Sequence, residues 1–196
     1  MRVSDDRYSR DRLRLDLALR FIQHEARTRT IRAFTGLTDD RIRKLYRSYC
    51  AHPVRSVTRP RGKSPQQAAF FTRSPRVQQE TAFLASLCSL LGALPQAREP
   101  LRPAARTAGD PAVALGERVC QAFEAYRLIV PAARISFEHL ILLLAALKRG
   151  DELRLTVCGS CGALLVVERL AARQNRCLYC LAEPPEPAGP PRVRAA

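Results

Sequence analysis

Four cysteines near the C-terminus stand in two Cys-x-x-Cys pairs separated by fifteen residues: Cys158, Cys161, Cys177 and Cys180. Two residues between paired cysteines let one tight turn present both sulfurs to the same ion, and four thiolates suit the tetrahedral coordination of zinc. The segment between the pairs is too short to build a hydrophobic core, so a bound metal would supply the stability that it lacks. The spacing therefore predicts one structural Zn²⁺ per chain.

Two disulfides, or four unligated thiols, are the alternative interpretations of these cysteines. Disulfides suit a secreted protein, but the first twenty residues are rich in Arg and Asp and contain no apolar segment typical of a secretory signal. We therefore expect a reducing compartment. A thioredoxin-like redox role would leave the second pair unexplained. Four thiolates leave no open position on a metal, and no carboxylate or histidine pair suggests acid–base chemistry, so we do not expect an enzyme.

The net charge of +15 is concentrated in the first part of the chain. Residues 1–78 contain 19 Lys and Arg against 7 Asp and Glu, a balance of +12, whereas residues 79–196 contain 14 against 11, a balance of +3. The stretch from Arg41 to Arg76 holds ten basic residues and no acidic one. Such a field predicts a polyanionic partner. No apolar run is long enough to cross a bilayer, so no membrane partner is expected.

Apolar residues recur at helical spacing over most of the chain. This pattern predicts helices over residues 11–26, 28–34, 81–94, 113–130 and 137–149, and one that starts after Thr38. Cys88 and Cys120 fall within these patterns and are expected to pack as small buried hydrophobes. Residues 153–157 and 164–167 are expected to pair as strands beside the first cysteine pair. Four Xaa-Pro steps predict an extended basic linker over residues 51–76.

We therefore expect a mainly α fold, a helical bundle with an N-terminal helix-turn-helix-like segment and a small C-terminal four-cysteine zinc-binding module. Residues 1–150 would form a helical domain for DNA binding and partner docking, residues 151–182 the zinc module, and residues 183–196 a disordered proline-rich tail. The second helix of the helix-turn-helix-like segment is basic and amphipathic, as a helix that enters a major groove must be. Short helical hairpins are common, so the acid-free stretch that follows is what favours DNA over a solvated basic face.

Several short motifs, taken in order, resemble the FlhC family of flagellar transcriptional regulator subunits. They are Ala26-Arg27, Gly36-Leu37-Thr38, Arg43-Lys44-Leu45-Tyr46-Arg47, Arg61-Gly62-Lys63-Ser64-Pro65, Phe70-Phe71, Ala125-Tyr126-Arg127-Leu128 and the two cysteine pairs. The resemblance extends from Leu17 to Pro184 and implies a helical, cytoplasmic, DNA-binding activator with a zinc site of four cysteines. It also implies a smaller FlhD-like partner and recruitment of RNA polymerase at flagellar class 2 or related promoters. This chain has extra residues between Cys50 and Arg59 and lacks tryptophan, which fits a divergent paralogue.

The predicted DNA contacts are basic residues of the helical segments, the linker and the cysteine module. They are Arg27, Arg29, Arg41, Arg43, Lys44, Arg47, Arg61, Lys63, Arg173 and Arg176. An alternative from another class is a zinc-ribbon protein that binds RNA or a polymerase surface without reading duplex sequence. A redox-switched chaperone that releases zinc on oxidation is a third possibility, although it leaves the basic stretch unexplained.

Overall fold

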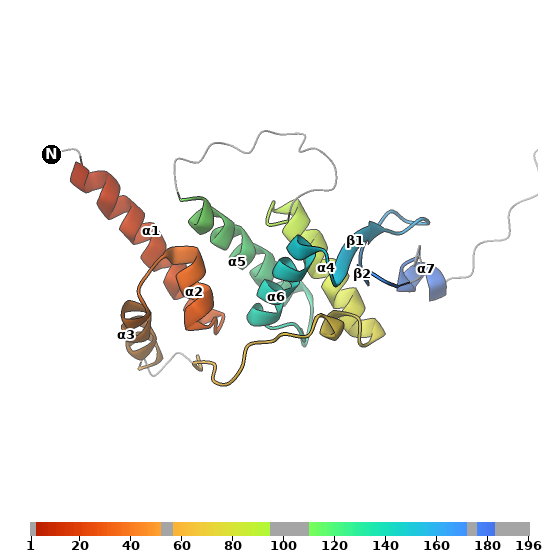
Figure 1. Cartoon of the computed structure of the whole chain (residues 1–196), viewed down its shortest axis with the longest axis horizontal. Coiled ribbons are helices and arrows are strands. Elements are labelled where there is room, and N and C mark those ends of the chain that lie inside the picture. The colour runs from red at the N-terminus through yellow and green to blue at the C-terminus, as the bar shows by residue number, and fades with distance from the viewer. Residues whose placement is uncertain (1–2, 52–56, 95–109, 172–175, 183–196) are drawn as a thin grey trace, which may run out of the picture.

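The computed structural model describes residues 3–51, 57–94, 110–171 and 176–182 (Figure 1). These residues form seven α-helices, one short 3-10 helix (η1) and a two-stranded antiparallel sheet. In chain order the elements are α1 (Val3–Gln23), α2 (Thr28–Thr35), α3 (Asp39–Cys50), η1 (Ala68–Phe71), α4 (Pro75–Leu90), α5 (Pro111–Ile129), α6 (Phe137–Arg149), β1 (Leu153–Val157), β2 (Leu164–Glu168) and α7 (Leu178–Ala182). The mainly α fold with a C-terminal cysteine cluster is confirmed. No helix in the described ranges has both the length and the apolar character needed to cross a membrane.

Helix α1 begins well before residue 11, where the apolar pattern predicted its start. Its second half packs into the core, because Leu17, Phe21 and Ile22 are fully buried, whereas Tyr8 and Leu13 nearer its start are exposed. In Figure 1 the first half of α1 accordingly extends beyond the other helices. A helix that gains its stability from an apolar face can continue past that face when its residues tolerate the helical conformation.

The turn between α2 and α3 follows the sequence prediction closely. Helix α2 ends at Gly36, whose φ of 68° is the left-handed conformation that glycine adopts without strain. The hydroxyl of Thr38 accepts a hydrogen bond from the Arg41 N–H at 3.4 Å and so caps α3. Helices α2 and α3 contact each other across this turn. The finer assignment of a helix-turn-helix DNA reader stays a prediction.

The C-terminal end of the predicted linker is helical, and here the prediction was wrong. Ser74 is the N-cap of α4, and its hydroxyl accepts a hydrogen bond from the Val77 N–H at 3.4 Å. Pro75 occupies the first turn, where its fixed φ suits a helix and its missing N–H has no intrahelical partner to lose. Residues 68–71 form η1 instead of extended chain. Residues 57–67 contain no helix or strand, in agreement with the predicted linker. Residues 52–56 lie outside the described residues.

The centre of the molecule is a bundle in which α5 contacts α1, α2 and α4. Gly116 lies where α5 crosses α1, and a Cβ at this position would come within 2.7 Å of Leu17 Cδ2. The absence of a side chain at Gly116 therefore sets how closely the two helices approach. Cys88 and Cys120 are fully buried in this core, as predicted, and burial raises the pKa of the Cys88 thiol to about 12.

The hairpin of β1 and β2 pairs Leu153 with Glu168 and Val157 with Leu164. Strand β2 lies against α4, and β1 contacts α6. Leu153 and Val166 belong to the main core, whereas Leu165 and Val167 pack in a smaller cluster with two of the cysteines. The hairpin therefore shares apolar contacts with the helices, although sequence analysis placed a domain boundary at residue 150.

Candidate metal centre and basic surface

The four predicted metal ligands lie together at the end of the β-hairpin. The turn between the strands carries Cys158 and Cys161, and it is closed by hydrogen bonds from Gly162 N–H to Cys158 O at 2.9 Å and from Cys158 N–H to Ala163 O at 2.8 Å. Gly162 has a φ of 73°, as expected for such a turn. Cys177 and Cys180 approach from the start of α7, where Leu181 N–H donates to Cys177 O at 3.0 Å.

The sulfur positions fit a single metal ion. All four Sγ atoms lie within 4.8 Å of one another, and Cys161 Sγ is 3.7 Å from Cys177 Sγ. A tetrahedron of thiolates about 2.3 Å from zinc would have sulfur–sulfur edges of about 3.8 Å. The four cysteines can therefore hold one metal ion with little movement. Zinc is the ion that four thiolates typically bind.

Backbone N–H groups stabilise negative charge on the sulfurs. Hydrogen bonds from the backbone N–H groups of Cys161, Cys177 and Ser160 lower the pKa of Cys158 to about 6. The Cys177 N–H lies 3.3 Å from Cys158 Sγ, and the Cys180 N–H lies 3.4 Å from Cys177 Sγ. Thiol hydrogen bonds to Cys177 and Cys161 raise the pKa of Cys180 to about 12, so a metal would have to displace that proton.

Arg176 lies at the rim of the cysteine cluster, and its Nε donates to Ser160 Oγ at 3.2 Å. This contact ties the chain before α7 to the cysteine turn of the hairpin. The other basic residue predicted here, Arg173, lies outside the described residues. Along the long axis of Figure 1, α7 is at the opposite end from α3, so Arg176 is not brought together with the basic residues of α3.

Helix α3 presents its basic residues to solvent. Its buried face consists of Ile42, Tyr46 and Tyr49. The side chains of the four basic residues predicted to contact DNA are exposed: Arg41, Arg43, Lys44 and Arg47. Two carboxylates in the first turn are paired with arginine, since Asp39 lies 3.3 Å from Arg32 and Asp40 lies 3.0 Å from Arg43. Arg29 of α2 is also exposed.

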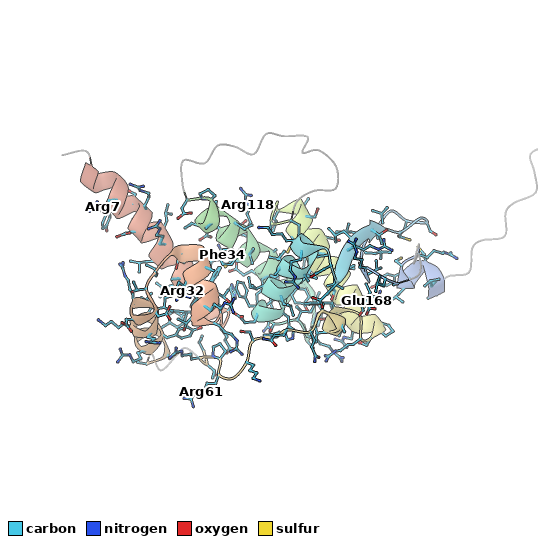
Figure 2. All side chains as sticks on the ribbon, in the orientation of Figure 1. Arg7, Arg32, Phe34, Arg61, Arg118 and Glu168 are labelled. Carbon is cyan, nitrogen blue, oxygen red and sulfur yellow. The ribbon has the colours of Figure 1, made fainter. Side chains whose placement is uncertain are left out.

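A second group of cations lies on residues 57–67, here called the basic segment. This segment runs along the lower edge of the molecule from the side of α3 towards η1 (Figure 1). Arg59, Arg61 and Lys63 are exposed, and Figure 2 shows Arg61 projecting away from the body. Arg59 lies over the Tyr46 ring, 5.6 Å from its centroid, which places the segment beside α3. Sequence analysis omitted Arg59 from the contact set, although its position in the acid-free stretch was a usable signal.

Arg27 differs from the other predicted contacts because it faces the protein. Its side chain is 18% exposed, and its guanidinium donates to the carbonyl oxygens of Gly62 at 2.5 Å and Lys63 at 2.7 Å. Its backbone N–H donates to Glu138 Oε1 at 2.8 Å. Sequence analysis assigned Arg27 to DNA from its charge alone and gave no sign of these long-range contacts.

An open apolar groove of about 710 Å³ lies between α4, the end of α5 and the cysteine module. Phe83, Ile129, Leu164 and Tyr179 are among its lining residues, and Ile129 and Tyr179 are exposed by 57% and 69%. Sequence analysis assigned partner docking to residues 1–150, which include α4 and α5. Both helices contribute to the groove, but their larger apolar surfaces pack against each other and the core.

Comparison with protein-family models finds no match, and comparison with curated proteins finds no significant match.

Proposed function

We propose that this chain is a cytoplasmic DNA-binding subunit of a transcription activator, with a structural zinc ion in its cysteine cluster. The basic residues of α3 and of the basic segment contact the phosphates of duplex DNA. The FlhC resemblance supplies the setting: an FlhD-like partner completes the complex, and the complex recruits RNA polymerase at flagellar or related promoters.

The observation that carries this proposal is the grouping of exposed cations at one end of the molecule. Arg41, Lys44 and Arg47 lie on α3, and Arg61 and Lys63 lie on the adjacent basic segment. The nearby carboxylates Asp39 and Asp40 are already paired with arginine. Concentrated like charge on a fold costs free energy through self-repulsion, which a polyanion removes.

The cysteine cluster has a structural role in this proposal. Four thiolates fill the coordination shell of zinc, so the ion has no open position for chemistry. Bound metal would fix the turn of the β-hairpin to α7, adding to a small apolar cluster that includes Leu165 and Val167 and to the Arg176–Ser160 hydrogen bond. The metal would therefore hold α7 to the hairpin, and the hairpin itself packs against α4 and α6.

Binding of labelled duplex DNA, measured by fluorescence anisotropy over a range of salt concentrations, tests the proposal. The protein is assayed alone and with its FlhD-like partner. The duplex is one that the complex has selected from a pool of random DNA sequences. The double variant Lys44→Ala/Arg47→Ala should weaken binding about tenfold and reduce the salt slope by about 1.8, since each lost phosphate contact removes about 0.9.

The matched control is Arg118→Ala/Lys148→Ala, which removes the same charge from α5 and α6. This control should bind DNA as the unmodified chain does. If both double variants lose the same DNA affinity, the loss depends on the total charge of the protein and not on the position of the cations. That result would contradict the proposed surface. Preference for RNA over duplex DNA in competition would instead support the zinc-ribbon alternative.

A further inference from the structure

We propose that Arg27 is a positioning residue that shapes the basic segment for DNA, and that it does not contact DNA itself. This inference rests on the proposed function, because the segment that Arg27 holds carries two of the proposed phosphate contacts, Arg61 and Lys63. It replaces the direct contact that the sequence predicted for Arg27.

The geometry places Arg27 under the turn of the basic segment. The guanidinium reaches three successive carbonyl oxygens, those of Arg61 at 3.4 Å, Gly62 at 2.5 Å and Lys63 at 2.7 Å. These carbonyl groups face Arg27 and the protein body. The side chains of Arg61 and Lys63 are accordingly exposed, and Arg61 points away from the body in Figure 2.

Gly62 makes this convergence possible. Its φ of 84° lies in the left-handed region, which side chains other than glycine rarely adopt. No atom lies within 4 Å of the place where a Cβ would stand. A glycine is therefore needed here for its backbone conformation and not for lack of space.

Two further contacts hold the same segment on the junction of α1 and α2. The Thr58 N–H donates to Glu25 Oε1 at 3.1 Å, and Arg59 Nη2 donates to Thr28 Oγ1 at 3.2 Å. Glu138 of α6 accepts from the Arg27 backbone and lies 4.0 Å from its Nε. The backbone at Arg27 is thus fixed by α6 as well as by its place at the start of α2.

The charges explain why an arginine is suited to this place. Arg59, Arg61 and Lys63 lie within five residues, and Arg27 adds a fourth cation beside them. The Arg27 guanidinium donates to backbone carbonyl groups and lies 4.0 Å from Glu138, whereas the side chains of Arg61 and Lys63 are exposed to an external anion. The planar guanidinium can donate to several acceptors at once, whereas a lysine is a point charge with less directional donors.

The Arg27→Lys variant separates positioning from direct contact because it keeps the positive charge but loses the planar set of guanidinium N–H donors. DNA affinity should fall about fivefold in Arg27→Lys, and the same substitution in an Arg61→Ala/Lys63→Ala background should have no further effect. Gly62→Ala, which keeps every charge, should weaken DNA binding similarly. The control is Arg127→Lys on α5, which likewise exchanges one exposed cation for another outside the proposed DNA surface and should bind like the unmodified chain.

Trypsin cleavage gives a readout that does not involve DNA. Cleavage after Arg61 and Lys63, followed by mass spectrometry, should be severalfold faster in Arg27→Lys and Gly62→Ala than in the unmodified chain. Circular dichroism checks that each variant has kept its helices. Unchanged cleavage in both variants overturns the inference.

The outcomes also separate this inference from the proposed function. If Arg61→Ala/Lys63→Ala binds DNA like the unmodified chain, the basic segment is not part of the DNA surface, and the inference falls with that part of the proposal. If the double variant weakens binding but Arg27→Lys does not, the inference alone is overturned. A loss in Arg27→Lys that adds fully to that of the double variant assigns Arg27 a direct contact and also overturns it.

Discussion

At the scale of single residues, Glu80 of α4 shows how a buried charge is accommodated. Its side chain lies in the core, where it accepts hydrogen bonds from the Tyr126 hydroxyl at 2.5 Å, the Arg134 N–H at 2.9 Å and Arg76 Nε at 3.2 Å. Burial raises the pKa of this carboxyl, but the three donors outweigh burial and the net pKa is lowered. Glu80 therefore remains ionised and connects α4 to α5 and to the loop before α6.

Replacing Glu80 with alanine should destabilise the fold by about 2–4 kcal/mol, because the Tyr126 hydroxyl and the Arg134 N–H lose their acceptor in the interior. Urea unfolding followed by circular dichroism measures the change. The control is Asp16→Ala on α1, where the side chain is 61% exposed. This substitution should change the free energy of unfolding by less than about 0.5 kcal/mol. Equal stabilities of the two variants would contradict the structural role of Glu80.

At the scale of elements, α1 and α5 are joined by a cluster of charged groups. Arg20 of α1 donates to both carboxylate oxygens of Glu124 and also to Glu117, and His24 lies 2.9 Å from Glu124. The hydrogen bond from Arg20 is the main cause of the lowered pKa of Glu124. Burial lowers the pKa of His24, and its contact with Glu124 offsets part of that effect.

Both shifts predict the same response to pH. A group whose pKa is lower in the folded state takes up its proton more readily when the chain unfolds, so its contribution to stability is lost as the pH falls. For His24 the loss begins near its unfolded pKa of about 6.5, and for Glu124 it follows at more acidic pH.

Urea unfolding from pH 7.5 to 5 should therefore show falling stability, with a weaker dependence in His24→Gln. Measurements at high salt should preserve the His24 effect, because burial causes it. Stability that rises as the pH falls would contradict the assignment.

Sequence patterns predicted most helices because capping residues and apolar spacing act locally. Thr38 marked the start of α3 correctly, and the four cysteines were assigned to one cluster from spacing alone. The start of α4 was missed because Ser74-Pro75 was interpreted as a helix-breaking step, whereas proline is also favoured in the first turn. Contacts such as Arg27 to Gly62 join residues 35 positions apart, and no local pattern specifies them.

At the scale of the whole molecule, the cysteine hairpin is part of the main fold. Leu153 and Val166 are buried in the same core as the helices, and β2 lies against α4. Sequence analysis treated the C-terminal module as a separate unit whose stability depends on its metal. The shared core instead predicts that metal loss weakens the whole protein.

Removal of the metal with a chelator should lower a single unfolding midpoint, since the hairpin and the helices share their core. A loss of about 5 kcal/mol would correspond to about 10–20 °C for a chain of this length. Differential scanning calorimetry measures the midpoint, and elemental analysis should find one zinc per chain before chelation. Cys50→Ser, which changes an exposed cysteine outside the cluster, should leave both values unchanged. A separate low-temperature transition with an unaffected main one would show that the hairpin unfolds independently.

Helix α6 has a consequence for how distant parts of the molecule communicate. Its thirteen residues span about 20 Å. Glu138 in its first turn meets the backbone of Arg27, and just beyond its last turn Gly150 leads into β1. Helix α6 thus connects the residue that supports the basic segment to the hairpin that carries the cysteine pair Cys158 and Cys161. Under the proposed function, loss of zinc from the cysteine cluster should therefore also weaken DNA binding at the opposite end of the molecule.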